Sequence, residues 1–259
     1  MLIATWNVNS LRARLPRVLE FVKQHRPDVV CLQETKCAAD TFPVAELQAA
    51  GYGAEHHSGG QWAGVALLAR EGLTFVEPVH GLAGEPVATE ARWCEATVAG
   101  IRFASTYVPN GRTLDSPEFP RKLAFLDAIA ARARAARAAG EPPLVIAGDM
   151  NIAPADADVY DPAAFVGSTH VSDDERGRLR AILSGGHLLD AYRQVHPDVP
   201  QFTWWDYRAG NFHKGLGLRI DLALISETLA GRLVACGIDR NFRKGTKPSD
   251  HAPLLVELR

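Results

Sequence analysis

Carboxylate, amide, imidazole and phenol side chains recur where short apolar segments of this chain end or begin. These side chains belong to Asn7, Glu34, Tyr107, Asp149, Asn151, Asp221, Asp250 and His251. Each of them alone is more typical of a turn, a helix cap or a core aromatic residue. Their joint occurrence at successive strand ends predicts that they converge on one cleft.

The types of these side chains favour a hard divalent cation. Four carboxylates and two amides provide oxygen ligands, which Mg²⁺ and Mn²⁺ prefer. Zinc is disfavoured because neither a second histidine nor paired cysteines accompany them. The chain has no G-x-S-x-G segment for a serine nucleophile and no G-x-x-x-x-G-K loop for phosphate binding. The sequence therefore indicates metal-assisted chemistry.

Short β-rich runs would deliver these side chains. The predicted strands are Leu2–Val8, Asp28–Gln33, Gly64–Ala69, Ala91–Val98, Ile101–Val108, Leu144–Ala147, Phe202–Trp205, Ile220–Ile225 and Leu254–Leu258. The apolar periodicity predicts helices from Leu11 onward and from Arg121 to Gly140. The segment Ala153–Gly186 is expected to be loop-like, with a short helical stretch near Asp174–Leu183.

Several predicted strands are apolar at consecutive positions, as in VVCL, VALLA and LVIAG. Such strands are covered on both faces, which favours an α/β fold with two stacked sheets flanked by helices. Strands at both ends of the chain, with no linker-like segment between them, predict a single domain over residues 1–259.

Composition narrows the class of protein. The 259 residues are 47% hydrophobic and 22% charged, as in ordinary globular proteins, and the net charge of −2 gives no global attraction to polyanions. A local cluster of cations could still bind nucleic acid. Cys31, Cys37, Cys94 and Cys236 form no C-x-x-C pair and are expected to be buried free thiols. Without a signal peptide or a membrane-spanning run, we expect a cytoplasmic protein that does not contact a membrane.

Seven segments together resemble the exonuclease III family of DNA-repair nucleases, within the endonuclease/exonuclease/phosphatase superfamily. They are TWNVNSLRAR, LQETK, TYVPNG, GDMNIAP, FTWWDYR, GLRIDLALIS and KPSDHAPL. They occur in the family's order and span nearly the whole chain. The resemblance implies a four-layer α/β sandwich. It also implies a Mg²⁺-dependent enzyme, with Mn²⁺ as a substitute, that cuts double-stranded DNA 5′ of abasic sites and trims or cleans 3′ ends.

The resemblance also implies roles for individual residues. Glu34 matches the principal metal ligand, and the wider metal site would comprise Asn7, Glu34, Asp149, Asn151, Asp250 and His251. Asp149 would align or deprotonate the attacking water, and Asn151 would orient it. His251 would contact the phosphate while Asp221 orients the imidazole. Tyr107 matches a phenol near the scissile phosphate, with the roles of donor, phenolate and positioner left open.

DNA-binding residues are predicted in the same way. Trp204, Leu218 and Ile220 match apolar positions that receive a flipped abasic sugar, although core packing explains Trp204 and Ile220 almost as well. Lys244 and Lys247, near Arg240 and Arg243, form a basic run that is either a phosphate contact or a solvated face. Arg12, Arg14 and Lys36 are further candidates.

Two other functions remain open at this point. One is a phosphatase or phosphodiesterase of the same superfamily that acts on inositol lipids or small phosphoesters. The other is a catalytically weak module that binds damaged DNA. The GLRID segment, the paired tryptophans and the RKGTK run favour DNA as the substrate, and the complete set of polar residues favours catalysis. A monomer is expected.

Overall fold

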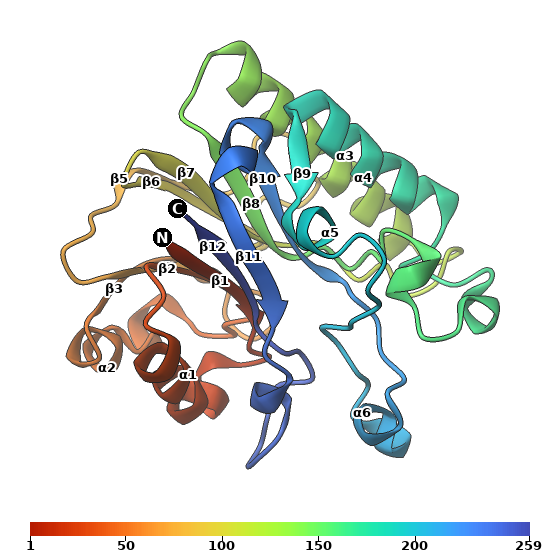
Figure 1. Ribbon diagram of the computed structural model, residues 1–259, viewed down its shortest axis with the longest axis horizontal. Helices are drawn as coiled ribbons and strands as arrows, with labels where there is room; N and C mark the ends of the chain where they lie inside the picture. Colours follow the sequence, from red (N-terminus) through yellow and green to blue (C-terminus); the bar gives the residue numbers. More distant parts are fainter.

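The computed structural model describes residues 1–259 and places two β-sheets face to face (Figure 1). The strands of the first sheet are β1 (Leu2–Asn7), β2 (Val29–Gln33), β3 (Tyr52–His57), β4 (Val65–Arg70), β11 (Leu233–Ile238) and β12 (Leu254–Leu258). The strands of the second are β5 (Val76–His80), β6 (Trp93–Val98), β7 (Ile101–Tyr107), β8 (Leu144–Asp149), β9 (Leu188–Asp190) and β10 (Asp221–Ser226). Their orders are β11-β12-β1-β2-β4-β3 and β5-β6-β7-β8-β10-β9.

Alternation along the strands explains the consecutive apolar residues. In β2, Val29 and Cys31 belong to the core cluster between the sheets, whereas Val30 and Leu32 belong to the cluster under the outer helices. Successive side chains of a strand point to opposite faces of the sheet, so a strand between two apolar layers must be apolar at every position. The expected α/β fold of two stacked sheets flanked by helices is confirmed.

Helices form the outer layers on both sides (Figure 1). The core clusters place α1 (Leu11–His25) and α2 (Val44–Ala49) on the first sheet, and α3 (Glu118–Ala138) and α4 (Asp173–Gly186) on the second. The short α5 (Ala191–Val195) contacts β10 and β11 and so joins the two sheets at one edge. The remaining helix is α6 (Asn211–Lys214), and none of the helices is long and apolar enough to cross a membrane.

The two ends of the chain pair in the middle of the first sheet. Strand β12 runs antiparallel to β1, with Leu2 opposite Glu257. On its other side, β1 pairs in parallel with β2. Figure 1 shows both termini close together at one end of the sandwich.

Most predicted elements are present, with one wrong and several missed. The segment Phe202–Trp205 is not a strand, because only Trp204 forms isolated bridges, to Leu218 and His251. Strands β3, β5, β9 and β11 were not predicted. Helix α4, at 14 residues, is longer than the predicted stretch. The four cysteines are buried and free, as predicted.

Candidate active site

The register of the second sheet aligns three polar side chains at one end of its neighbouring strands. Asp149 ends β8, opposite Tyr107 of β7 on one side and Asp221 of β10 on the other. Gly148 permits this close pairing, because a Cβ there would lie 1.9 Å from the carbonyl oxygen of Thr106. The sequence thus places a phenol and two carboxylates side by side across three neighbouring strands.

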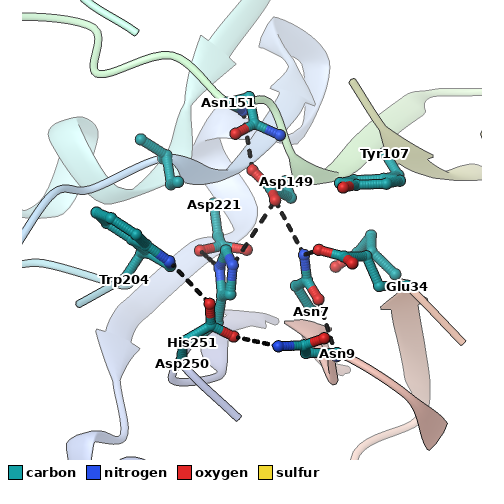
Figure 2. Close-up of polar contacts among 12 residues, drawn as sticks. Asn7, Asn9, Glu34, Tyr107, Asp149, Asn151, Trp204, Asp221, Asp250 and His251 are labelled. Carbon is teal, nitrogen blue, oxygen red and sulfur yellow. Dashed lines mark hydrogen bonds and ion pairs between the residues drawn. The ribbon is translucent and has the colours of Figure 1, made fainter. Parts of the chain in front are cut away.

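The first sheet supplies the facing residues. Asn7 ends β1, and Glu34 follows β2 in the left-handed conformation at φ 50°. The amide nitrogen of Asn7 donates to Glu34 Oε1 at 2.8 Å and to Asp149 Oδ2 at 2.9 Å. Asn7 therefore connects the carboxylates of the two sheets (Figure 2).

Asp149 contacts residues from both sheets. Its Oδ1 accepts a hydrogen bond from the backbone N–H of Asn151 at 2.9 Å, and its Oδ2 lies 3.8 Å from His251 Nε2. Burial, together with the charges of Asp221 and Glu34, raises the pKa of Asp149 to about 7 despite the attraction of His251. Such a pKa suits a general base at neutral pH.

His251 is held by a second carboxylate. Its Nδ1 lies 2.8 Å from Asp221 Oδ2, and both side chains are buried. Burial lowers the pKa of His251, but the charge and hydrogen bond of Asp221 and the charge of Asp149 outweigh it and raise the pKa to about 10. The imidazole therefore carries a positive charge at neutral pH.

Tyr107 lies on the other side of Asp149, with the guanidinium carbon of Arg92 4.7 Å from its ring centroid. Burial and the charges of Glu34 and Asp149 raise the pKa of Tyr107 well above its ordinary value. The phenol is therefore protonated and can donate a hydrogen bond.

Asn151 and Asp250 lie at opposite sides of the cluster (Figure 2). Asn151 has φ 51°, and its side-chain nitrogen donates to the carbonyl of Val108 at 2.9 Å. Asp250 accepts hydrogen bonds from Asn9 at 3.0 Å and from Trp204 Nε1 at 3.1 Å. Burial raises the pKa of Asp250, but the charge of His251 and these two hydrogen bonds outweigh it and lower the pKa.

One group of side chains could hold a metal ion. Ligand atoms of Glu34, Asp149 and His251 lie within 4.8 Å of one another. Two of these groups are carboxylates, which suit a hard cation, whereas a protonated His251 cannot donate a lone pair. The donor set therefore fits a divalent cation between Glu34 and Asp149. Asp250 is not part of this group, and Asn7 donates hydrogen bonds to both of its carboxylates.

The predicted DNA-binding residues lie in different environments. Arg12, Lys244 and Lys247 are exposed, whereas Leu218 and Ile220 are buried. The last two pack with Ala153 and Val159, and the partly buried Trp204 covers this small cluster. Lys36 reaches inward, where its Nζ lies 2.7 Å from Glu34 Oε2 and donates to Asn9 Oδ1 at 2.7 Å.

Several residues at the cleft were not singled out from the sequence. Asn9 links Lys36 to Asp250, and Asn110 donates to Asn151 Oδ1 at 3.3 Å. His170 Nδ1 lies 2.6 Å from the carbonyl oxygen of Asn151. The TWNVN and YVPNG segments contained a signal for the two asparagines, but nothing near His170 marked it.

A surface pocket beside Tyr107 was also missed. Its lining includes Trp62, Arg92, Asn110 and Arg112, and its volume is about 330 Å³. The side chain of Trp62 is 79% exposed. A tryptophan within the Gly-rich segment SGGQWAG is the sequence signal that could have drawn attention to it.

Comparison with known proteins places the chain in a family. The model of the Endonuclease/Exonuclease/phosphatase family matches residues 4–251. The chain belongs to this family. Within the endonuclease/exonuclease/phosphatase family, it is 31% identical over 274 residues to exodeoxyribonuclease III of Haemophilus influenzae, with 100% of each chain covered.

Solved structures of the endonuclease/exonuclease/phosphatase family superpose closely. The 3′ phosphatase NExo from Neisseria, bound to product DNA hairpin, has a TM-score of 0.96 and 39% identity, covering 100% of this chain and 99% of that one. An AP endonuclease from Archaeoglobus fulgidus has a TM-score of 0.93 and 35% identity, with the same coverage. Both share the stacked sheets that position the cluster.

Proposed function

We propose that this protein is a Mg²⁺-dependent DNA-repair nuclease that cleaves double-stranded DNA 5′ of abasic sites and hydrolyses phosphate esters at 3′ ends. One observation carries the proposal: buried Asp149 and charged, buried His251 meet the partly buried Glu34 in one cluster. These groups are a base, a metal-binding carboxylate and a cation, the combination that phosphodiester hydrolysis needs. Full-length similarity to exodeoxyribonuclease III supports DNA as the substrate.

Glu34 and Asp149 would hold the metal ion, and Asn7 would keep the two carboxylates at their separation. When bound, Mg²⁺ or Mn²⁺ would stabilise the negative charge that develops on the phosphate oxygens. Asp250 would support the site indirectly, because both of its oxygens accept hydrogen bonds from Asn9 and Trp204.

The acid–base steps would fall to this chain's own side chains. Asp149 would take the proton of the attacking water, aided by Asn151, whose N–H holds its other oxygen. His251, held by Asp221, would place its positive charge against a phosphate oxygen. Tyr107 would donate a hydrogen bond as a neutral phenol.

DNA would bind across the exposed cations and the apolar cluster beside the site. Lys244, Lys247 and Arg12 would contact phosphates, which neutralises charge without regard to base sequence. The partly buried ring of Trp204 would contact the sugar of a flipped abasic nucleotide, above the cluster that contains Leu218 and Ile220. Lys36 would also contact a phosphate when it leaves Glu34.

A balance toward 3′-end processing is a second candidate. The higher TM-score and identity of the Neisseria 3′ phosphatase, relative to the archaeal AP endonuclease, favour it. In this case the same cluster would act mainly on 3′-phosphates, and incision at abasic sites would be slow.

Two labelled duplexes test the proposal. One carries a single abasic site and the other a 3′-phosphate, and each is incubated with Mg²⁺ or with EDTA. We expect metal-dependent incision of the first and metal-dependent release of phosphate from the second, both lost in Asp149→Asn. Action on the second duplex alone selects the 3′-end candidate. Hydrolysis of a soluble phosphoester without DNA cleavage, or duplex binding without any turnover, contradicts the proposal.

A further inference from the structure

A lysine and a glutamate lie completely buried behind the catalytic cluster. Lys122 of α3 and Glu175 of α4 form an ion pair, and both side chains are 0% exposed. Replacing such a buried pair with apolar residues is often neutral or stabilising. The pair is therefore poorly explained by stability alone, and the polar groups that it holds become relevant.

The Lys122 ammonium group binds three loops at once. It donates to the carbonyl oxygens of Asn110 at 3.1 Å and Asn151 at 2.7 Å, and to Thr169 Oγ1 at 3.2 Å. These residues follow β7, follow β8 and precede α4, respectively. Lys122 thus joins the loops that border one side of the cleft.

Glu175 fixes the third loop from the other side. Its Oε1 accepts the backbone N–H of His170 at 2.9 Å, and its Oε2 accepts the N–H of Ser172 at 3.0 Å. Ser172 is the N-cap of α4, and Glu175 completes the capping box. The loop that carries His170 is therefore anchored to the helix and to Lys122 together.

Asn151 is the point where this network meets the catalytic cluster. Its backbone is left-handed, at φ 51°, a conformation that asparagine tolerates better than most residues with a Cβ and that its contacts must maintain. Its carbonyl oxygen accepts a hydrogen bond from Lys122 Nζ, while its backbone N–H donates one to Asp149 Oδ1. Gly111 leaves room for the lysine, because a Cβ there would lie 2.9 Å from Lys122 Cδ.

We propose that Lys122 and Glu175 are positioning residues, which hold Asn151 in its left-handed conformation and thereby orient the carboxylate of Asp149. The inference rests on the proposed nuclease function. Because neither side chain reaches the surface, the pair should affect the chemical step and leave DNA binding unchanged. Loss of the pair misplaces Asp149 and slows the chemical step without weakening DNA binding.

Four variants test this: Glu175→Gln, Lys122→Met, the double variant Lys122→Met/Glu175→Gln, and Glu95→Gln as control. Glutamine keeps the capping box but removes the charge. Glu95 forms a buried ion pair with Arg102 outside the cleft. We measure Tm, single-turnover cleavage at saturating abasic duplex, and the Kd for DNA in Ca²⁺.

We expect Glu175→Gln and the double variant to cut on the order of 10- to 100-fold more slowly, with the Kd changed less than about threefold. The double variant should regain Tm relative to Lys122→Met, because it leaves no unpaired buried charge. Glu95→Gln should keep the wild-type rate at a temperature where it is folded.

A double variant that is folded and cuts at the wild-type rate overturns the proposal. If the double variant does not fold, Glu175→Gln and Glu95→Gln decide, and equal rates for these two overturn it. If the wild-type protein itself does not cut DNA, the proposed function fails. Hydrogen exchange over residues 149–153 then tests the positioning alone, and unchanged exchange in Glu175→Gln refutes it.

Discussion

Asp149 and His251 are opposite partners of one interaction, a base with a raised pKa beside a charged imidazole. Removing the carboxylate in Asp149→Asn should lower the cleavage rate by about 10² to 10⁴. Asp149 and His251 are buried rather than open to water, so the effect of the substitution on stability needs its own argument. Asparagine removes the repulsion from Glu34 and Asp221, so Tm in the absence of metal should not fall.

The double variant Asp149→Asn/His251→Gln provides the control. Because both groups act on the same transition state, its loss should be much smaller than the product of the single losses. Single-turnover rates and melting curves measure both effects. A variant that retains more than roughly a tenth of the wild-type rate removes its residue from the mechanism.

Glu34 should determine the metal dependence. EDTA should abolish cleavage, and Mg²⁺ or Mn²⁺ should restore it, because the cluster provides hard oxygen ligands. Glu34→Ala should require a higher concentration of metal for half-maximal activity, measured by titration with Mg²⁺. Full activity in chelator, or an unchanged metal requirement in Glu34→Ala, contradicts this.

Lys247 is exposed, lies three residues before Asp250 in the sequence and should act through phosphate contact. Lys247→Gln should weaken binding to all duplexes alike and reduce the log–log salt slope by roughly one unit. Lys23→Gln is the matched control, since Lys23 is an exposed lysine near the far end of α1. Equal slopes for Lys247→Gln and the wild type would make that lysine an ordinary solvated residue.

At the scale of elements, Glu95 connects β6 to β7 and α3. It forms ion pairs with Arg102 and Arg132. Burial raises the pKa of Glu95, but hydrogen bonds and charges from both arginines outweigh it and lower the pKa. The charged form is therefore stabilising above the ordinary pKa of a glutamate, about 4.3. This stabilisation is lost as the pH falls through the lowered value.

Glu95→Gln should therefore lower the free energy of unfolding at pH 7 by about 3 kcal/mol. Tm should fall by on the order of 10 °C. The difference from the wild type should shrink as the pH falls below about 4. Melting curves from pH 3 to 7 measure it. Glu118→Gln, which removes a solvent-exposed pair with Arg121, should change Tm little. A difference independent of pH would contradict the assigned charge of Glu95.

The elements also show what sequence could predict. Strands between two apolar layers, such as β2 and β8, have a continuous apolar signal and were predicted. Strand β5 is exposed along its length and contains Pro78, while β3 contains Gly53 and two histidines. Such edge strands are defined by pairing with a neighbour, which single-strand patterns do not encode. The segment Phe202–Trp205 is the opposite case. Its composition predicts a strand, but only Trp204 pairs with neighbours, through isolated bridges.

The candidate site follows the same logic. Asp149 and Asp221 were predicted from strand ends, and register then places them opposite each other. The position of His170 depends on a loop held by buried charges, which no local pattern specifies. The roles assigned to individual residues stay predictions.

For the whole molecule, burial in two core clusters makes the four thiols reporters of unfolding. Burial raises the pKa of Cys94 and Cys236 to about 12, and also raises the pKa of Cys31 and Cys37. The thiolate is the reactive form, so none of the four should react with Ellman's reagent in the folded protein. All four should react in denaturant. Rapid reaction of any one in native buffer would contradict the described packing.

The pairing of the two chain ends has a consequence for biosynthesis. Ser249 donates to the carbonyl of Asn7 at 2.7 Å, and Trp6 Nε1 donates to the carbonyl of His251 at 3.0 Å. Synthesis proceeds from the N-terminus at about 5–20 residues per second. A nascent chain thus presents Glu34 and Asp149 well before His251 emerges from the ribosome. Until then its imidazolium is missing from the cleft, so we expect the nascent chain to lack cleavage activity.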